Sequence, residues 1–346
     1  MTQVFLNVLD GMNVEYELID RRFSKSVSEV GAFNLRKVAA GAGLIYRAFR
    51  ASRRADIDFC VFFTTNRSFS FVVDVILSMI FRSANFPVIA YVHTLGYADL
   101  AKKSSIHLWA VKQLIGSSER VVTLGPAIVE DVAPFSRNEV ISIHNTLPFS
   151  PDVGPTFRKS SGRMLFFSNL IAEKGIDEFT ALALQLAPKF PNARFSIAGA
   201  ESYSGQIAEI ESQIVASRLS GSVRVLGAIS PDEKWQLLQD HDLLVFPSQY
   251  KFEAQPLSII EAAASHVATV AYSVGGISDV VEAGRSGVLV AAGDTKAFER
   301  EVAALLADSA SLDLYRHGAR EVYLERFSLE TYATRWAHVI RQLMDR

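Results

Sequence analysis

The sequence has little of several features that mark particular classes of protein. Cys60 is the only cysteine among 346 residues. The chain therefore has no internal disulfide or cysteine-rich metal site, and the apolar run around Cys60 indicates a buried, unreactive thiol. Neither charge sign is in large excess, because 35 Lys and Arg residues oppose 37 Asp and Glu residues. This balance argues against general binding to nucleic acid.

Long apolar segments and a signal peptide are also missing from the sequence. Residues 1–11 have no basic region, and Asn7 and Asp10 interrupt their apolar stretch. The most apolar segment, residues 69–81, contains Asp74 and is too short to span a bilayer. These features predict a soluble, cytoplasmic protein, with peripheral contact at the inner face of a membrane left open.

What the sequence does have is enough apolar residues for two large cores. Hydrophobic residues make up 49% of the chain and charged residues 21%, so disorder is not expected. A length of 346 residues suggests two domains.

The first half alternates apolar strands and amphipathic helices. A helix ends near residue 9, and further helices are predicted at residues 35–50, 69–80 and 106–115. Strands are predicted at residues 14–19, 58–63, 87–92, 121–124 and 140–143. Continuous β-branched runs between helices indicate a parallel sheet that is covered on both faces.

A segment rich in Pro and Gly at residues 147–162 separates this half from a second half with the same rhythm. Strands are predicted there at residues 163–167, 194–198, 223–226, 242–246, 268–272 and 288–290. Helices are predicted at residues 176–187, 206–219, 231–239, 256–265 and from 295 onward.

The predicted fold class is therefore α/β, with two tandem doubly wound Rossmann-like domains that face each other. The predicted divisions are an acceptor-side domain at residues 1–150, a linker at 151–162 and a nucleotide-sugar domain at 163–325. A final helix at 326–346 is expected to pack back toward the first domain. Because ligands bind at the carboxyl ends of parallel strands, the cleft between the domains is the default site.

The turn at residues 251–262 carries the most chemistry. Glu253 lies in the loop after a predicted strand, and Glu261 lies on the second turn of the following helix. Pro256 is predicted at the first helical position, where its missing N–H costs no hydrogen bond. The free N–H groups of Leu257 and Ser258 would then form an anion site between the two carboxylates.

Two other loops follow predicted strands. The segment Ser168–Gly175 places Lys174 where it would reach a diphosphate, and Gly175 where the backbone could turn closely. A solvated helix cap is the alternative interpretation for that pair of residues. The glycines at residues 275–276 would either let the backbone approach a ligand or form an ordinary tight turn.

Together, these segments resemble the retaining glycosyltransferases of family 4, which have the GT-B fold. The family's usual segments are G-R-L-x-x-E-K-G, E-G-x-P-L-x-x-x-E-A, G-G-I-P-E and G-x-x-G. Their counterparts here are S-N-L-I-A-E-K-G at 168–175, E-A-Q-P-L-S-I-I-E-A at 253–262, G-G-I-S-D at 275–279 and G-R-S-G at 284–287. The resemblance covers about residues 160–345.

The resemblance implies a nucleotide-diphosphate sugar donor, of UDP or GDP type, held mainly by the second domain. Glu261 would bind the ribose hydroxyls, and Glu253 would face the donor sugar as a catalytic residue. Lys174 and the N–H groups from Pro256 to Ser258 would hold the diphosphate. No metal and no cofactor beyond the donor are implied.

The first domain and one position of the second depart from the family pattern. His93 ends a strand, as in the family, where it would contact the donor sugar or the reacting centre; a structural histidine is the alternative. Thr65, Asn66 and Arg67 are acceptor-side candidates. Asn169 stands where the family has a diphosphate-binding arginine. The family's first strand and glycine-rich loop are also not found before the opening helix, which predicts a gap in the sheet.

These observations favour a retaining hexosyltransferase that moves a sugar to a glycan or lipid-linked acceptor, in surface polysaccharide biosynthesis. A homologue that binds nucleotide-sugar or a partner enzyme without catalysis is the main alternative. A sugar-nucleotide epimerase is the third possibility, which the spacing between Glu253 and Glu261 fits less well.

Overall fold

The computed structural model describes residues 2–20, 35–151 and 158–344. The chain divides into two compact units. Unit 1 comprises Met1–His144 and Ala333–Arg346, and unit 2 comprises Asn145–Tyr332. The division after His144 precedes the predicted domain end at residue 150, and residues 152–157 of the predicted linker lie outside the described residues.

In the part of unit 1 that the structure describes, four parallel strands form one sheet in the order β1-β2-β3-β4. Its strands are β1 (Cys60–Thr64), β2 (Val88–Val92), β3 (Arg120–Thr123) and β4 (Val140–Ser142). Its helices are α1 (Thr2–Gly11), α2 (Leu35–Ala51), α3 (Ser68–Ser83), α4 (Tyr97–Ala101), α5 (Ser105–Gly116), α6 (Pro126–Val132) and η2 (Ala133–Phe135). The last helix, α13 (Leu329–Met344), begins in unit 2 and ends in unit 1.

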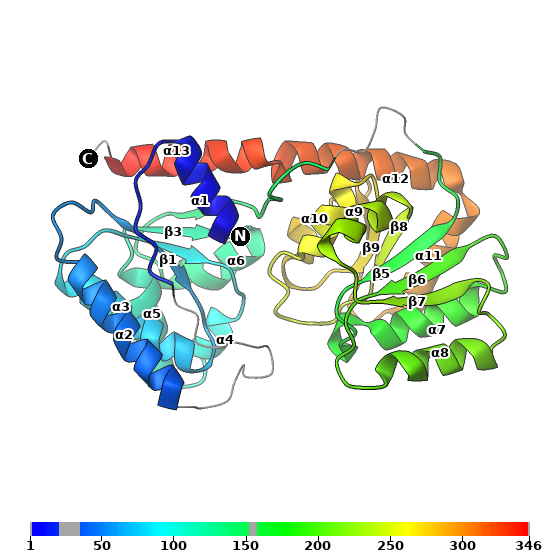
Figure 1. Ribbon diagram of the computed structural model, residues 1–346, viewed down its shortest axis with the longest axis horizontal. Coiled ribbons are helices and arrows are strands. Elements are labelled where there is room, and N and C mark those ends of the chain that lie inside the picture. Colours follow the sequence, from blue (N-terminus) through cyan, green and yellow to red (C-terminus); the bar gives the residue numbers. More distant parts are fainter. Residues whose placement is uncertain (1, 21–34, 152–157, 345–346) are drawn as a thin grey trace. The chain divides into compact units, whose positions relative to one another are not determined.

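The alternation of side chains along β1 explains why helices cover both faces of this sheet. Phe62 packs against Phe81 of α3, with ring centroids 5.8 Å apart, and Phe63 packs against Phe5 of α1 at 6.2 Å. Figure 1 accordingly shows α2, α3 and α5 on one side of the sheet and α1 on the other. Trp336 of α13 completes the α1 side, 4.6 Å from the Phe5 ring.

The strand predicted at residues 14–19 is wrong. Those residues pair with no strand in the described sheets, and Tyr16 and Leu18 are exposed. An apolar–acidic alternation is typical of a strand, but a strand also needs a neighbouring edge to bond. The described strands β1 to β4 are neighbours in chain order, so no gap separates them, and β1 forms an edge of the sheet.

The described residues of unit 2 contain a sheet of six parallel strands in the order β10-β9-β8-β5-β6-β7. The strands are β5 (Arg163–Phe167), β6 (Arg194–Ala198), β7 (Val223–Gly227), β8 (Leu243–Phe246), β9 (Ala268–Tyr272) and β10 (Gly287–Val290). The helices are η3 (Ala172–Lys174), α7 (Ile176–Leu186), α8 (Gln206–Ala216), α9 (Pro231–Gln239), α10 (Leu257–Ala264), η4 (Gly275–Asp279), α11 (Thr295–Ala307), α12 (Ser309–Val322) and η5 (Tyr323–Phe327).

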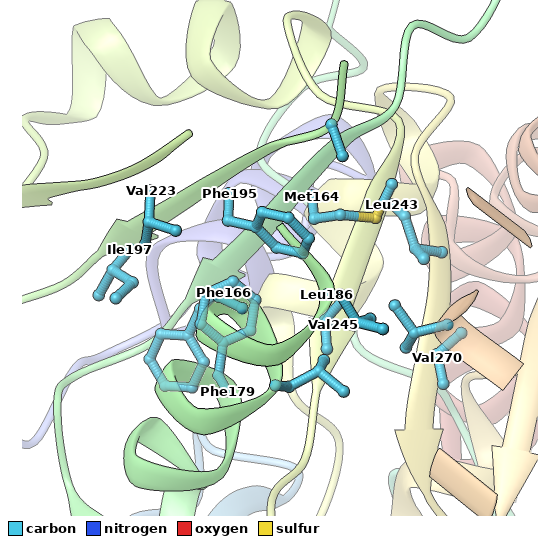
Figure 2. Close-up of a cluster of buried hydrophobic side chains, with 14 of the residues drawn as sticks. Met164, Phe166, Phe179, Leu186, Phe195, Ile197, Val223, Leu243, Val245 and Val270 are labelled. Carbon is cyan, nitrogen blue, oxygen red and sulfur yellow. The ribbon is translucent and has the colours of Figure 1, made fainter. Parts of the chain in front are cut away.

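Two apolar clusters pack on the two faces of this sheet. One lies beneath α7, α8 and α11, and the other beneath α9, α10 and α12. Figure 2 shows the first cluster, where Phe166 of β5, Phe179 of α7 and Phe195 of β6 meet. The side chains of both clusters are closely packed and buried, and this packing holds the strand ends in fixed positions for the loops that follow them.

The strand order places a topological switch point between β5 and β8. From β5 the chain first adds β6 and β7 on one side, and then β8, β9 and β10 on the other. The loops after β5 and β8 therefore leave the sheet in opposite directions and open a crevice at their carboxyl ends. The candidate site of unit 2 is built from these two loops.

Candidate functional site

The loops after β5 and β8 bring Lys174 and Glu253 together at the switch point. The Lys174 ammonium forms an ion pair with the Glu253 carboxylate. The Ser248 hydroxyl donates to the same carboxylate oxygen at 3.0 Å, and the Tyr250 ring lies 5.0 Å from the ammonium. Glu253 is buried, so these contacts compensate a carboxylate that has lost most of its water.

Glycine is required where these loops touch other backbone. Gly175 has φ of +85°, and a Cβ there would lie 2.2 Å from the Pro247 carbonyl oxygen. Gly276 donates its N–H to the Glu253 carbonyl, and a Cβ would lie 1.7 Å from the Ala254 oxygen. Gly175 lies after β5, Glu253 after β8 and Gly276 after β9. The two glycines thus allow these three loops to pack closely against one another, and this packing positions Glu253.

The helix after Glu253 begins one residue later than predicted. Pro256 is the N-cap of α10 with an extended ψ of 117°, and Leu257 is the first helical residue. Placing Pro256 at the first helical position was wrong, because its ψ is not helical. The N–H groups of Leu257 and Ser258 still lie in the first turn, where no intrahelical acceptor is available to them.

Glu261 is held by a lysine from the preceding helix. Lys234 of α9 donates to Glu261 at 2.5 Å, and their side chains are 23% and 13% exposed. Burial raises the pKa of Glu261, and the Lys234 ammonium partly opposes that rise. Trp235 lies beside this pair, with the Lys234 ammonium 4.6 Å from its ring.

Asn169 follows β5 at the same edge of the sheet, and its side chain is exposed. Being uncharged, it offers hydrogen bonds to a ligand but no electrostatic attraction. Asn145, at the start of unit 2, has a structural role, because its N–H donates to Gln255 at 2.7 Å and so steadies the loop before α10.

In unit 1, His93 follows β2 directly. Its ring stacks on Phe63 with centroids 5.2 Å apart and lies edge-on to the Tyr91 ring with centroids 4.0 Å apart. Its Nε2 atom is buried without a hydrogen-bond partner among the described residues. Burial lowers the pKa of His93 to about 3, so the imidazole is neutral at physiological pH.

Other unpartnered polar atoms gather at the same strand ends of unit 1. Thr64 and Val92 are paired in register, so the residues that follow β1 and β2 leave the sheet side by side. Among the described residues, Thr65 Oγ1, Asn66 Oδ1 and Thr94 Oγ1 are buried and have no partner. Asn66 is anchored by its amide, which donates to the Leu95 carbonyl at 2.7 Å. Orphaned buried groups are rare, so this clustering marks a candidate ligand subsite.

Arg67 differs from its neighbours, because it is the exposed N-cap residue of α3 and contributes no side-chain cap. The negative charge of Asp131 has a structural role. Asp131 of α6 accepts the N–H groups of Gly96, Tyr97 and Ala98 at 2.8–2.9 Å and so caps α4.

No group of three or more His, Cys, Asp or Glu side chains in residues 2–20, 35–151 and 158–344 is arranged to hold a metal ion. A pocket of about 290 Å³ is lined by Arg163, Arg194 and Arg224. Because these residues stand at or near the starts of β5, β6 and β7, that pocket lies at the opposite edge from the switch point and is separate from this site.

Sequence reasoning missed Lys234 and Ser248. Lys234 is 27 residues from Glu261, and no spacing rule joins two helices across a strand. Ser248 carried a weak signal, since it follows β8 by two residues and parallel strands present their carboxyl ends to the site.

Comparison with known proteins shows what this chain is similar to. Residues 154–322, just under half of the chain, match the family model of glycosyl transferases group 1, and the match lies wholly within unit 2. The chain is 26% identical over 256 residues to a glycogen synthase of Mycobacterium tuberculosis, covering 70% of this chain and 59% of that protein. It is 31% identical over 191 residues to an alpha-maltose-1-phosphate synthase of Mycolicibacterium smegmatis, covering 52% of this chain and 46% of that protein.

The chain therefore spans less than two thirds of the length of these relatives. Among solved structures, HepE of Anabaena in complex with UDP and glucose is similar, with a TM-score of 0.68 and 19% identity. The likeness covers 98% of this chain and 89% of HepE. At that identity it shows the fold alone, and with the two parallel-sheet units it confirms the predicted GT-B fold.

Proposed function

We propose that this protein is a retaining hexosyltransferase that moves a sugar from a nucleotide-diphosphate sugar to a glycan or lipid-linked acceptor. The observation that carries the proposal is the meeting of the Lys174–Glu253 pair with the first turn of α10 at the switch point. N–H groups that can donate hydrogen bonds to a phosphate, a cation and a buried carboxylate are thereby held at the edge where parallel sheets bind ligands.

The donor diphosphate would lie against the N–H groups of Leu257 and Ser258. Lys174 would then share its charge between the diphosphate and Glu253, stabilising negative charge on the leaving group as the glycosidic bond breaks. This arrangement needs no charge at Asn169, whose amide would add a hydrogen bond. The Glu253 carboxylate, fixed by the Ser248 hydroxyl, would accept hydrogen bonds from the donor sugar.

The nucleoside would be recognised by Glu261. An ionised carboxylate offers both of its oxygens as acceptors to two vicinal hydroxyls, whereas protonation turns one of them into a donor. Because burial favours the protonated form, Lys234 has a positioning role: it keeps the Glu261 carboxylate charged and oriented toward the ribose. We favour UDP over GDP as the carrier, since HepE of similar fold was solved with UDP.

Unit 1 would supply the acceptor side of the reaction. Thr65 and Asn66 each keep one buried oxygen that has no partner among the described residues, as a hydroxyl-rich acceptor requires. His93 would contact the sugar as a neutral hydrogen-bonding group, because its low pKa keeps it from acting as a cation. A lipid-linked acceptor of a surface polysaccharide would bring the protein to the cytoplasmic face of a membrane.

The test is a donor screen with the full chain, using UDP-, GDP- and ADP-sugars and glycan or lipid-linked acceptors. We expect transfer from a UDP-sugar, and retention would be read from the anomeric signal of the product by NMR. Glu253→Gln should lower the transfer rate at least tenfold. Glu211→Gln, an exposed carboxylate on α8, is the matched control and should leave the rate unchanged. Equal rates for the Glu253→Gln variant and the parent would refute the catalytic assignment.

The uncharged Asn169 favours one second candidate, a homologue that binds nucleotide-sugar without transfer. Its signature would be a raised melting temperature with UDP and no turnover on any donor. Asn169→Arg should then tighten UDP binding without creating activity.

A further inference from the structure

Three helices of unit 1 present an apolar surface that the proposed reaction does not use. Helices α2, α3 and α5 pack side by side over one face of the sheet (Figure 1). Large apolar side chains on their outer surfaces are exposed: Tyr46, Phe49, Val72, Ile76, Met79, Ile106 and Trp109. We call this surface the α2–α3–α5 face. Ile106 is 75% exposed and Trp109 52%, although both have ample apolar area to bury.

The spacing of these residues makes the face continuous. Val72, Ile76 and Met79 recur at four and three residues along α3, so they form one stripe on its outer side. Helix α3 contacts both α2 and α5, which carry the exposed side chains of Tyr46 and Trp109. A monomer rarely leaves a contiguous apolar area of this kind exposed without a partner.

The exposed charges that these three helices carry have one sign. Asp74 is the single acidic residue of these three helices, and it is fully buried, where its carboxylate accepts the Thr65 N–H at 2.8 Å. The exposed charged residues of the helices are basic: Arg47 and Arg50 on α2, Arg82 on α3 and Lys112 on α5. The three helices thus combine exposed apolar side chains with exposed cations and, among their described residues, no exposed anion.

This combination selects among possible partners. A second copy of the chain, docked face to face, would bring the same cations against each other, which is unfavourable. A nucleic acid would use the cations but leave the apolar stripe in contact with phosphates. An anionic lipid surface takes both, because acyl chains bury the apolar side chains while headgroups neutralise the cations. Trp109 and Tyr46 are of the residue types that favour the interface between the two.

We propose that the α2–α3–α5 face binds the surface of membranes that contain anionic lipid. The three helices lie in the plane of the surface, with Val72, Ile76 and Met79 among the acyl chains. No helix among the described residues is long and apolar enough to cross a membrane, so this contact is a peripheral one. Binding requires neither donor nor acceptor, and the proposal stands or falls independently of sugar transfer.

The experiment is co-sedimentation of the full chain with vesicles of phosphatidylcholine alone or mixed with phosphatidylglycerol. We expect binding to the mixed vesicles that is at least tenfold stronger and that falls as salt is added. Ile76→Ser with Trp109→Ser should lower it at least tenfold, and Arg47→Glu with Lys112→Glu should do the same. Leu314→Ser, at a still more exposed apolar position on α12 of unit 2, is the matched control and should change nothing.

A second measurement keeps the proposal testable if a variant folds poorly. Brominated lipids should quench the tryptophan fluorescence of the parent protein, and Trp109→Phe should remove most of that quenching. Three outcomes would overturn the proposal. They are equal binding to neutral vesicles, equal loss of binding in the Leu314→Ser control, or a dimer in solution that the Ile76→Ser, Trp109→Ser variant abolishes.

Discussion

Replacing Lys234 with methionine is the sharpest test of the electrostatics at the proposed donor site. The change keeps a long, largely apolar side chain and removes only the ammonium that lies 2.5 Å from Glu261. Glu261 is then left as a mostly buried carboxylate without its cation. Removing one partner of a buried ion pair costs about 3–5 kcal/mol. Because the two side chains keep 23% and 13% exposure, we expect the lower end, about 3 kcal/mol at pH 8.

The cost of Lys234→Met should depend on pH in a defined direction. Burial raises the folded-state pKa of Glu261 above its ordinary value of 4.5, and losing Lys234 raises it further. Below pH 4.5 the carboxyl is protonated in the folded and the unfolded state alike, so the penalty disappears. It grows as the pH rises from 4.5 toward the folded-state pKa, because over that range the unfolded chain has released a proton that the folded chain still holds, and it is constant at higher pH. Urea unfolding at pH 5 and pH 8 should therefore show a smaller loss at pH 5.

Two further variants separate this effect from simple loss of packing. The Lys189 side chain pairs with Glu299 and is 54% exposed. Lys189→Met should therefore lower stability by less than about 1 kcal/mol. Lys234→Met combined with Glu261→Gln removes both charges and should recover most of the loss. A penalty that is equal at pH 5 and pH 8, or a double variant no better than Lys234→Met alone, would refute the reasoning.

Two other predictions concern the loops and the histidine. Gly175→Ala should destabilise the chain by more than 2 kcal/mol, because about 1–2 kcal/mol of left-handed strain adds to a clash of its Cβ with the Pro247 oxygen. Gly284 has a similar φ of +83° and open space around it, so Gly284→Ala should show the strain alone. Thermal melting of both variants beside the parent protein would measure the two losses of stability. The His93 imidazole should show no NMR titration between pH 5.5 and 8, since burial lowers its pKa to about 3. Stability should fall as pH drops below 6.5, where the unfolded chain binds the proton and the folded chain does not; an NMR midpoint near 6.5 would mean that the ring is solvated.

Local pattern was sufficient for most of unit 2. The strand predicted at residues 268–272 and the helix predicted at 231–239 match β9 and α9 residue for residue. The helix is marked by a Ser230–Glu233 capping box with proline after the cap. These signals act within a few residues, so they predict the helix start without any knowledge of the tertiary structure. The pattern at residues 14–19 failed because a strand depends on a partner that the local sequence does not specify.

The same distinction holds for the candidate site. The sequence by itself determined which chemical groups follow the strands: Lys174, Glu253, Glu261 and the first turn of the helix at Leu257. Only the tertiary structure decided how these groups are paired. Lys174 turns to Glu253, and Lys234, which no motif marks, holds Glu261. The physical reason is that a strand–loop–helix signal is local, whereas the strength of an ion pair depends on burial and distance, which the sheet and its two apolar clusters set.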